Sequence, residues 1–334
     1  MSSTILPAQA VHDLIAGALE RSDTSAANAA AVARALLAAE LAGQTGHGLR
    51  RVAAYAAQAA SGKVAGHVAP TVSQHRPGAI AVNANDGFAY PALEAAFAPL
   101  STAARTQGIA AAGIRRSHHC GVAGVTVEAY AAAGLAALMF ANSPGAMAPW
   151  GGRQALFGTN PIAFAAPVPD GEPIVVDVSL SKVARGKIMA AAQKGESIPE
   201  GWAFDAEGRP TTDPKAALAG TMAALGDAKG SALALMVELL AAGLTGAHFA
   251  SEASSFFDAE GAPPGVGQLI VAIDPALFGA GNVVARFGHL AEAIAGMDGA
   301  RVPGRRRQAL RREMLAHGIP VDDQLRQEIE KIGR

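Results

Sequence analysis

A histidine and an arginine stand four residues apart in the segment Gly46-His47-Gly48-Leu49-Arg50-Arg51. The glycines predict a turn that opens a helix. Residues four apart are neighbours on a helix, so His47 and Arg51 can together hold a carboxylate by a fork and offer a proton to the atom beside it. Taken alone, a histidine at a turn is more often a surface or capping group, and both interpretations stay open at this point.

A second polar cluster, from Arg115 to Gly121, directly follows a predicted strand and contains the adjacent histidines His118 and His119. The carboxyl end of a strand is where α/β sheets tend to place ligands. Neighbouring residues alternate in direction, so only one of these histidines can face a given site. A zinc site needs a third ligand at close spacing, and none follows. We therefore predict no metal site.

Three further segments join strand ends to loops or to helix starts. The loop within residues 141–161 is rich in Gly and Pro, so its backbone can approach a ligand, although such loops are commonly structural. In residues 177–188, Ser179 or Ser181 can cap a helix whose free N–H groups suit a phosphate. Lys229 precedes another helix and suits an anion, although a surface lysine is the commoner case.

The elements that must position these residues are helices towards both chain ends and an α/β layer structure between them. Three helices are predicted within residues 8–60, and helix returns from Arg305 onward. Apolar runs bounded by Gly, Pro or Asn predict strands at 79–84, 108–114, 135–141, 161–167, 173–179 and 268–274. Further helices are predicted at 90–106, 122–133, 183–193, 230–244 and 284–297. The G-x-G-x-x-G turn of the usual dinucleotide fold is absent, so a nicotinamide cofactor needs another mode of binding.

Composition restricts the class of protein. A chain of 334 residues predicts two packed units, and a formal charge of −1 argues against nucleic acid as the partner. Cys120 is the only cysteine, which excludes an intrachain disulfide and suits a reducing compartment. No leader pattern and no membrane-length apolar run is visible, so we expect a cytoplasmic protein. One arginine cluster is either a solvated helix face or a site for a phosphate-bearing cofactor: Arg301, Arg305, Arg306, Arg307, Arg311 and Arg312.

Taken together and in this order, the segments resemble the malate/L-lactate dehydrogenase family, which also contains ureidoglycolate and sulfolactate dehydrogenases and piperideine/pyrroline-2-carboxylate reductases. The resemblance is densest at HGLRRVAAY, SHHCG, APWGGRQALFGTNPIAFAAP, DVSLSKVARGKI, KGSALALMVELLAAGLTG and GQLIVAIDP. It implies an α/β protein with a helical domain from both chain ends (residues 1–75 with 300–334). The remainder, residues 76–299, would be a sheet-containing NAD(P)-binding domain of non-Rossmann type. A homodimer is also implied.

The resemblance assigns roles by position. His47 resembles the proton donor, Arg51 the carboxylate clamp and Thr159 a further substrate contact, while His119 matches an acid–base histidine of the ureidoglycolate branch. For NAD or NADP it points to these residues: Ser143, Asp177, Val178, Ser179, Lys229, Arg301, Gly304, Arg306 and Arg307.

Departures from the family pattern bear on the substrate. In the cyclic-imine reductases a serine precedes the histidine and an aspartate completes a relay, whereas this chain has Gly46 and Lys187 at those positions. Ala228 likewise replaces a histidine found in that branch. We therefore expect interconversion of a small 2-oxo acid and its 2-hydroxy acid. The alternatives are reduction of a cyclic ketimine such as 1-pyrroline-2-carboxylate or 1-piperideine-2-carboxylate, or a catalytically idle relative that only binds ligand.

Overall fold

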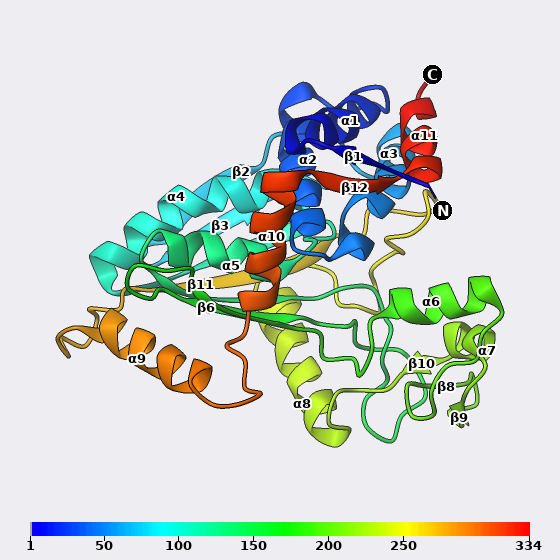
Figure 1. The fold of residues 1–334 in the computed structure, drawn as a ribbon. Helices are drawn as coiled ribbons and strands as arrows, with labels where there is room; N and C mark the ends of the chain where they lie inside the picture. The colour runs from blue at the N-terminus through cyan, green and yellow to red at the C-terminus, as the bar shows by residue number, and fades with distance from the viewer. Residues whose placement is uncertain (1) are drawn as a thin grey trace.

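A computed structural model describes residues 2–334 (Figure 1). The three helices expected near the N-terminus are confirmed as α1 (Ala8–Glu20), α2 (Ala26–Leu41) and α3 (Val52–Ala60). Helix α2 begins at Ser25 because the serine side chain accepts a hydrogen bond from the backbone N–H of Asn28. Two short 3₁₀ turns, Thr45–His47 and Leu49–Arg51, join α2 to α3.

A seven-stranded mixed sheet forms the centre of the molecule, in the order β2-β3-β4-β11-β5-β6-β7. The pairing of β3 with β4 is parallel, and the other neighbouring pairs of this sheet are antiparallel. All six predicted strands are confirmed, and β2 is an addition. The bounds are β2 (Thr71–Arg76), β3 (Ala79–Asn83), β4 (Ile109–Ser117), β5 (Ala136–Ala141), β6 (Ile162–Ala166), β7 (Ile174–Val178) and β11 (Val266–Ile273).

Helices cover both faces of this sheet, as Figure 1 shows. Helices α4 (Ala89–Gln107) and α5 (Ala123–Ala132) pack on one face. A π-helical segment (Glu238–Gly243), which continues α8 (Ala228–Val237), packs on the other. Helix α4 ends at Gly108, whose φ of +81° favours glycine and allows the chain to turn directly into β4. Helix α9 (Val283–Ala295) completes the elements predicted for the middle of the chain.

The chain ends differ from the expectation of continuous helix after Arg305. Helix α10 (Arg305–His317) is followed by strand β12 (Ile319–Asp322) and then by α11 (Asp323–Lys331). Strand β12 pairs antiparallel with β1 (Ser3–Leu6), so the helical prediction was wrong for these four residues. The physical reason is distant pairing, which no periodicity within a short segment reveals.

Two buried apolar clusters hold the molecule together. The first runs from the terminal helices through Tyr55 to the sheet at Ile114 and Ile270, and includes Ile319 from the C-terminal strand. Many of its members are alanines, whose small side chains let helices lie close to the sheet. The proposed division into domains at residues 75 and 300 stays a prediction.

The second cluster, which includes Met147, Leu180 and Ile188, lies under a small lobe that the sequence only partly predicted. The strands of this lobe are too short to give an alternating apolar and polar pattern in the sequence. The lobe comprises α6 (Arg185–Lys194), α7 (Pro214–Ala219) and the three-stranded sheet of β8 (Ala203–Phe204), β9 (Pro210–Thr211) and β10 (Thr221–Met222). Within residues 2–334, no helix is both long enough and apolar enough to span a membrane.

Candidate active site

The turn that carries His47 is fixed by a buried carboxylate. Glu40 of α2 is buried, and one of its oxygens accepts a 2.7 Å hydrogen bond from the backbone N–H of Leu49. A Cβ atom at position 48 would overlap that carboxylate, so glycine is required between the two 3₁₀ turns. The GHG sequence therefore places the imidazole by a close approach of backbone to side chain.

His47 is the first member of a hydrogen-bonded chain of four side chains. Its Nδ1 lies 3.2 Å from Nε2 of His119, and the two rings stack with centroids 5.1 Å apart. Nδ1 of His119 lies 2.5 Å from the hydroxyl of Tyr55, which in turn lies 3.1 Å from the hydroxyl of Tyr90. The 3₁₀ turn, α3, the end of β4 and α4 thus meet at one point.

Burial determines the charge state of this chain. Burial first, and then the positive charge of Arg51, lower the pKa of His47 to about 4 and that of His119 well below its usual range. Burial also raises the pKa of Tyr55 to about 12. At neutral pH both imidazoles are therefore neutral, and the chain has two proton arrangements. In one, Tyr55 donates to His119 and His119 donates to His47, which leaves the proton of His47 on Nε2.

Arg51 is held on two sides and free on a third. Its Nε donates a 2.9 Å hydrogen bond to the carbonyl of Gly46, and its guanidinium carbon lies 4.5 Å from the centre of the Phe257 ring. Its Nη1 is buried and has no hydrogen-bond partner among the described residues 2–334. A buried cationic donor without an acceptor is costly, so this edge fits an anionic group such as a carboxylate.

His118 points elsewhere, as the alternation of adjacent residues predicted. Its Nε2 lies 2.6 Å from the side-chain oxygen of Gln58, and its carbonyl accepts from the side chain of Gln268. Burial lowers its pKa to about 3. His118 thus belongs to the packing behind His119. Residues 2–334 contain no group of three or more His, Cys, Asp or Glu side chains placed to hold a metal ion.

The predicted cofactor and substrate residues include two linked pairs, Ser143 with Thr159 and Asp177 with Arg307. Ser143 and Thr159 meet at the ends of β5 and β6, where the backbone N–H of Thr159 donates to the Ser143 hydroxyl over 3.0 Å. The Ser179 hydroxyl donates over 3.3 Å to the carbonyl of Thr159 and lies 2.7 Å from the hydroxyl of Ser181. Ser143 and Ser179, from two different loops, therefore both bond to Thr159.

Asp177 forms the second pair, a 3.0 Å ion pair with Arg307. The next residue, Val178, is exposed, and Gly304 lies against Val175 of the same strand. The side chains of Lys229, Arg301 and Arg306 are exposed.

The arginine cluster is divided by this arrangement. Arg307 pairs with Asp177, while Arg311 binds the carboxylates of Glu128 and Glu172 at 2.9 Å and 3.2 Å.

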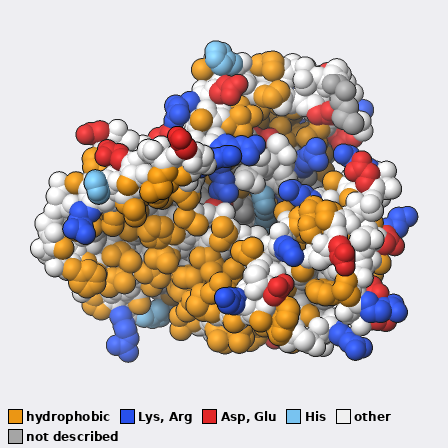
Figure 2. Space-filling model, turned by 60° about the horizontal axis from the view of Figure 1, so that its bottom comes forward, with side chains coloured by type: hydrophobic (Ala, Val, Ile, Leu, Met, Phe, Trp, Pro, Cys, Tyr) orange, Lys and Arg blue, Asp and Glu red, His pale blue; other side chains and the backbone are white. Residues whose placement is uncertain are grey.

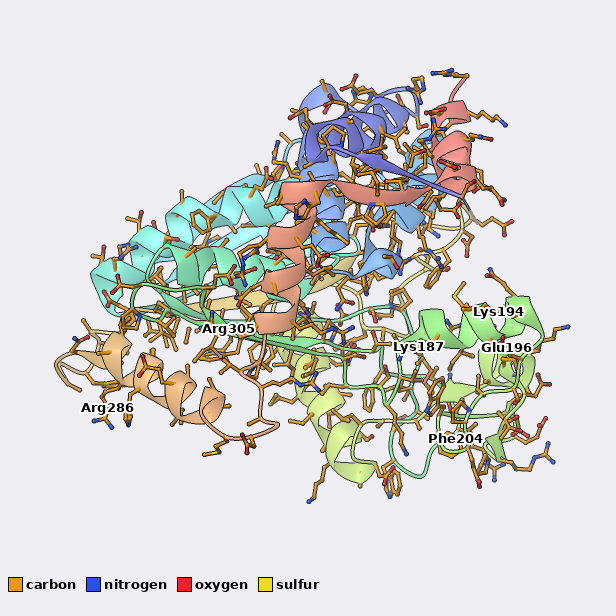
Figure 3. The ribbon with its side chains drawn as sticks, viewed as in Figure 1. Lys187, Lys194, Glu196, Phe204, Arg286 and Arg305 are labelled. Atoms are coloured by element: carbon orange, nitrogen blue, oxygen red, sulfur yellow. The ribbon has the colours of Figure 1, made fainter. Side chains whose placement is uncertain are left out.

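Figure 3 shows Arg305 at the N-terminal end of α10 and Lys187 on α6, on either side of the central part of the molecule. Figure 2 shows a hollow near the middle of the face in view, with Lys and Arg side chains around it and a histidine in it.

Glu238 is a site residue that the sequence analysis missed. Its buried carboxylate accepts hydrogen bonds from the side chains of Asn142 (3.2 Å) and Asn160 (2.9 Å) and from the backbone of Gly158 (3.4 Å) and Ala250 (3.1 Å). Burial raises its pKa. Glu238 begins the π-helical segment, a geometry that often marks functional sites. The signal in the sequence was a single acid within the apolar run ALALMVELLAAG.

Tyr55, the partner of His119, and Tyr90, the partner of Tyr55, were also missed. Tyr55 follows Arg51 by four residues, as Arg51 follows His47, so helical spacing alone would place all three on one face. Tyr90 gives no such signal, because its contact arises only when α4 packs beside α3.

These features place two neutral, hydrogen-bonded imidazoles near the charge of an arginine that has an unpartnered donor, an arrangement that suits an enzyme active site. The family model of malate/L-lactate dehydrogenase matches residues 6–330. The chain therefore belongs to the malate/L-lactate dehydrogenase family, and it is an oxidoreductase.

Relatives cover nearly the whole chain. A (2R)-3-sulfolactate dehydrogenase (NADP(+)) from Chromohalobacter salexigens is 50% identical over 311 residues, 93% of this chain and 93% of that protein. A Delta(1)-pyrroline-2-carboxylate/Delta(1)-piperideine-2-carboxylate reductase from Pseudomonas putida is 40% identical, over 99% of this chain and 98% of that protein. The crystal structure of delta1-piperideine-2-carboxylate reductase from Pseudomonas syringae has a TM-score of 0.93 at 39% identity and covers 98% of this chain and 99% of that chain.

Proposed function

We propose that this chain is an NAD(P)-dependent oxidoreductase that interconverts a small 2-oxo acid and its 2-hydroxy acid, of the malate, lactate or sulfolactate kind. One observation carries the proposal: Arg51 has a buried Nη1 without a partner, and its charge lies close enough to the hydrogen-bonded His47–His119 pair to lower the pKa of both rings. A carboxylate clamp and a proton donor are the two groups that hydride transfer to a 2-oxo acid requires of the protein. The sulfolactate dehydrogenase relative supports this class of substrate.

The proposed roles follow from the charges. Arg51 binds the substrate carboxylate, and Thr159 is a further substrate contact. His47 gives its proton to the oxygen of the substrate, while His119 and Tyr55 hold its ring from behind. Because the charge of Arg51 helps to keep the pKa of His47 low, a carboxylate on Arg51 raises that pKa. The histidine thus becomes a proton carrier when substrate is present. A bound nicotinamide supplies or accepts the hydride.

The residues present fit such a cofactor. Helix α8 has no side-chain cap at its N-terminus, and Lys229 lies in its first turn, a combination that suits a pyrophosphate. The Asp177 carboxylate suits ribose hydroxyls. Ser143, Val178, Ser179, Arg301, Gly304, Arg306 and Arg307 complete the proposed site for NAD or NADP. The largely antiparallel sheet supports a binding mode of non-Rossmann type, with the chain-end helices as a separate domain.

A homodimer is part of the proposal. Helix α8 and its π-helical continuation expose large apolar side chains, and Leu239 and Leu244 are 55% and 69% exposed. The face of the molecule in Figure 2 carries a broad apolar area. Such an area suits a second copy of the chain. A cytoplasmic location is also proposed, and the buried, free thiol of Cys120 supports it.

A cyclic ketimine is the second candidate substrate, favoured by the reductase from Pseudomonas syringae at a TM-score of 0.93. Gly46 and Lys187 stand against it, because the serine and aspartate of the relay are missing. A protonated imine needs less help from an acid, so the loss of the relay does not remove this candidate.

A panel assay tests the proposal. Purified protein is given NADH or NADPH with a series of 2-oxo acids and cyclic imines, and oxidation of the cofactor is followed. We expect turnover of a 2-oxo acid, loss of turnover in His47→Asn, and retention in the control His75→Asn, whose histidine is exposed on β2. Turnover of cyclic imines alone would favour the second candidate, and turnover of neither would contradict both.

A further inference from the structure

The segment of residues 254–262 reaches Arg51, whose guanidinium lies over the ring of Phe257. It lies between the π-helical segment and β11. Its own hydrogen bonds are local: the hydroxyl of Ser254 donates to the carbonyl of Ala262 over 2.6 Å, and the backbone N–H of Phe257 donates to the hydroxyl of Ser255 over 3.0 Å. A loop without regular structure needs further contacts to hold one conformation.

The Ser61 hydroxyl supplies one of those contacts, to the carbonyl of Ala259 over 3.1 Å, and a buried lysine supplies three more. The side chain of Lys63, which follows α3, is only 1% exposed. Its ammonium donates to the carbonyl of Ser255 (2.8 Å), to the carbonyl of Asp258 (3.1 Å) and to the Asp258 carboxylate (3.2 Å). All three of its N–H donors are therefore used. A buried charge is tolerated only with such acceptors, so Lys63 and this loop conformation depend on each other.

The two residues between these acceptors both reach the active site. Phe256 is 5% exposed, and its ring centre lies 5.2 Å from those of His118 and His119. Phe257 is 41% exposed and lies under the guanidinium of Arg51 at 4.5 Å. The stacked ring fixes the plane of the guanidinium, while Gly46 fixes its Nε edge, so Nη1 is left in one orientation.

We propose that Lys63 is a positioning residue for recognition of the substrate carboxylate: it holds residues 255–258 in the conformation in which Phe257 orients Arg51. The inference rests on the proposed role of Arg51 as the carboxylate clamp. Lys63 lies outside the motifs of the site, and its hydrogen bonds go to the loop.

Lys63→Met tests this proposal through a split between KM and kcat. The KM for the 2-oxo acid should rise roughly 5- to 30-fold, as expected when a partly buried cation–π contact and its orientation are lost. The kcat at saturating substrate should change much less, because the hydrogen bonds of the His47–His119 pair and of Tyr55 do not involve the loop. Lys194→Met, the same change at an exposed position on α6 (Figure 3), is the matched control and should leave both constants unaltered.

A double-mutant cycle separates positioning from general damage. If Lys63 acts through Phe257, the KM of Lys63→Met/Phe257→Leu should be no higher than that of the worse single variant. Independent, multiplying losses would overturn the proposal. So would a Lys63→Met enzyme that loses kcat and keeps its KM.

Asp258→Ala covers the case in which Lys63→Met does not fold. It removes one acceptor from an exposed residue and leaves both carbonyls to satisfy the lysine. Amide hydrogen exchange across residues 254–262 should accelerate, and the KM should rise by a smaller factor that disappears in Phe257→Leu. Unchanged exchange and KM would contradict the proposal. The exchange readout needs no substrate, so a failure of the proposed function would show separately, as absence of turnover in the unaltered protein.

Discussion

Replacing Arg51 in two ways separates its two proposed contributions. Arg51→Lys keeps the positive charge but loses the planar fork. One ammonium cannot reproduce the bond to Gly46, the stacking on Phe257 and the free Nη1 at once. Arg51→Gln removes the charge as well. The first change therefore tests geometry, and the difference between the two tests electrostatics.

The magnitude follows from the contacts. Loss of one charge-assisted pair to the substrate costs roughly 2 to 4 kcal/mol of transition-state stabilisation, so kcat/KM of Arg51→Lys should fall about 30- to 900-fold. The kcat/KM of Arg51→Gln should fall further, and the dependence of its kcat/KM on pH should also shift. The positive charge of Arg51 lowers the pKa of His47, which lies at about 4, so removing that charge raises this pKa. In the reducing direction the protonated imidazole is the acid, so the decline of kcat/KM with rising pH should move to higher pH.

The assay is steady-state oxidation of NAD(P)H by the best 2-oxo acid, across the pH range in which each variant stays folded. Arg50→Lys is the control, because this neighbouring arginine is exposed. Unchanged kinetics in Arg51→Lys would remove Arg51 from the substrate site. The same pH profile for the Lys and Gln variants would refute the coupling between Arg51 and His47.

His47→Asn should lower kcat roughly 10²- to 10⁴-fold while substrate still binds. Adding His119→Asn to that variant should lower kcat little further, because the two rings form one hydrogen-bonded unit. Loss of rate only in the His119 variant would reverse the roles of the two histidines. Lys229→Ala should raise the cofactor Kd, measured by titration, without a change in Tm, and an effect on substrate alone would contradict that role. The free energy of unfolding should fall as pH falls from 6.5 towards 3. In the folded state the pKa of His47 is about 4 and that of His118 is about 3. The folded state therefore binds fewer protons than the unfolded chain over this range, and acid favours unfolding. Denaturant titrations at several pH values measure this slope, and a flat profile would show that these histidines are not held neutral.

Much of the fold was predictable from local patterns. Short apolar runs between glycines and prolines located β3 to β7 and β11, and helical spacing located α1, α2 and α4. The order and direction of the strands could not be predicted, because strand pairing joins residues such as Ile270 and Ala112 that lie far apart in sequence. The strands β1 and β12 were missed for the same reason, since each has a partner only at the opposite end of the chain.

The candidate site divided in a similar way. His47 and Arg51 stood out by their spacing, although they lie on two 3₁₀ turns separated at Gly48 and not on one helix. The alternation of adjacent residues separated His118 from His119. Tyr90 and Lys63 gave no local signal, because their partners come from other elements, and the one signal of Glu238 was its place within an apolar run. The cofactor and substrate roles given to residues of the site stay predictions.

The pairing of β1 with β12 has a consequence for synthesis on the ribosome. Thr4 bonds to Asp323, 319 residues later, and Ile319 and Ile329 complete the core beneath the first helices. Residues 3–6 therefore lack their partners until residues 319–322 have left the ribosome. During that interval α1 and α2 expose apolar surface that the folded chain buries. Because the helix before the His47 turn belongs to the same core, the order of emergence makes the active site one of the last parts to form.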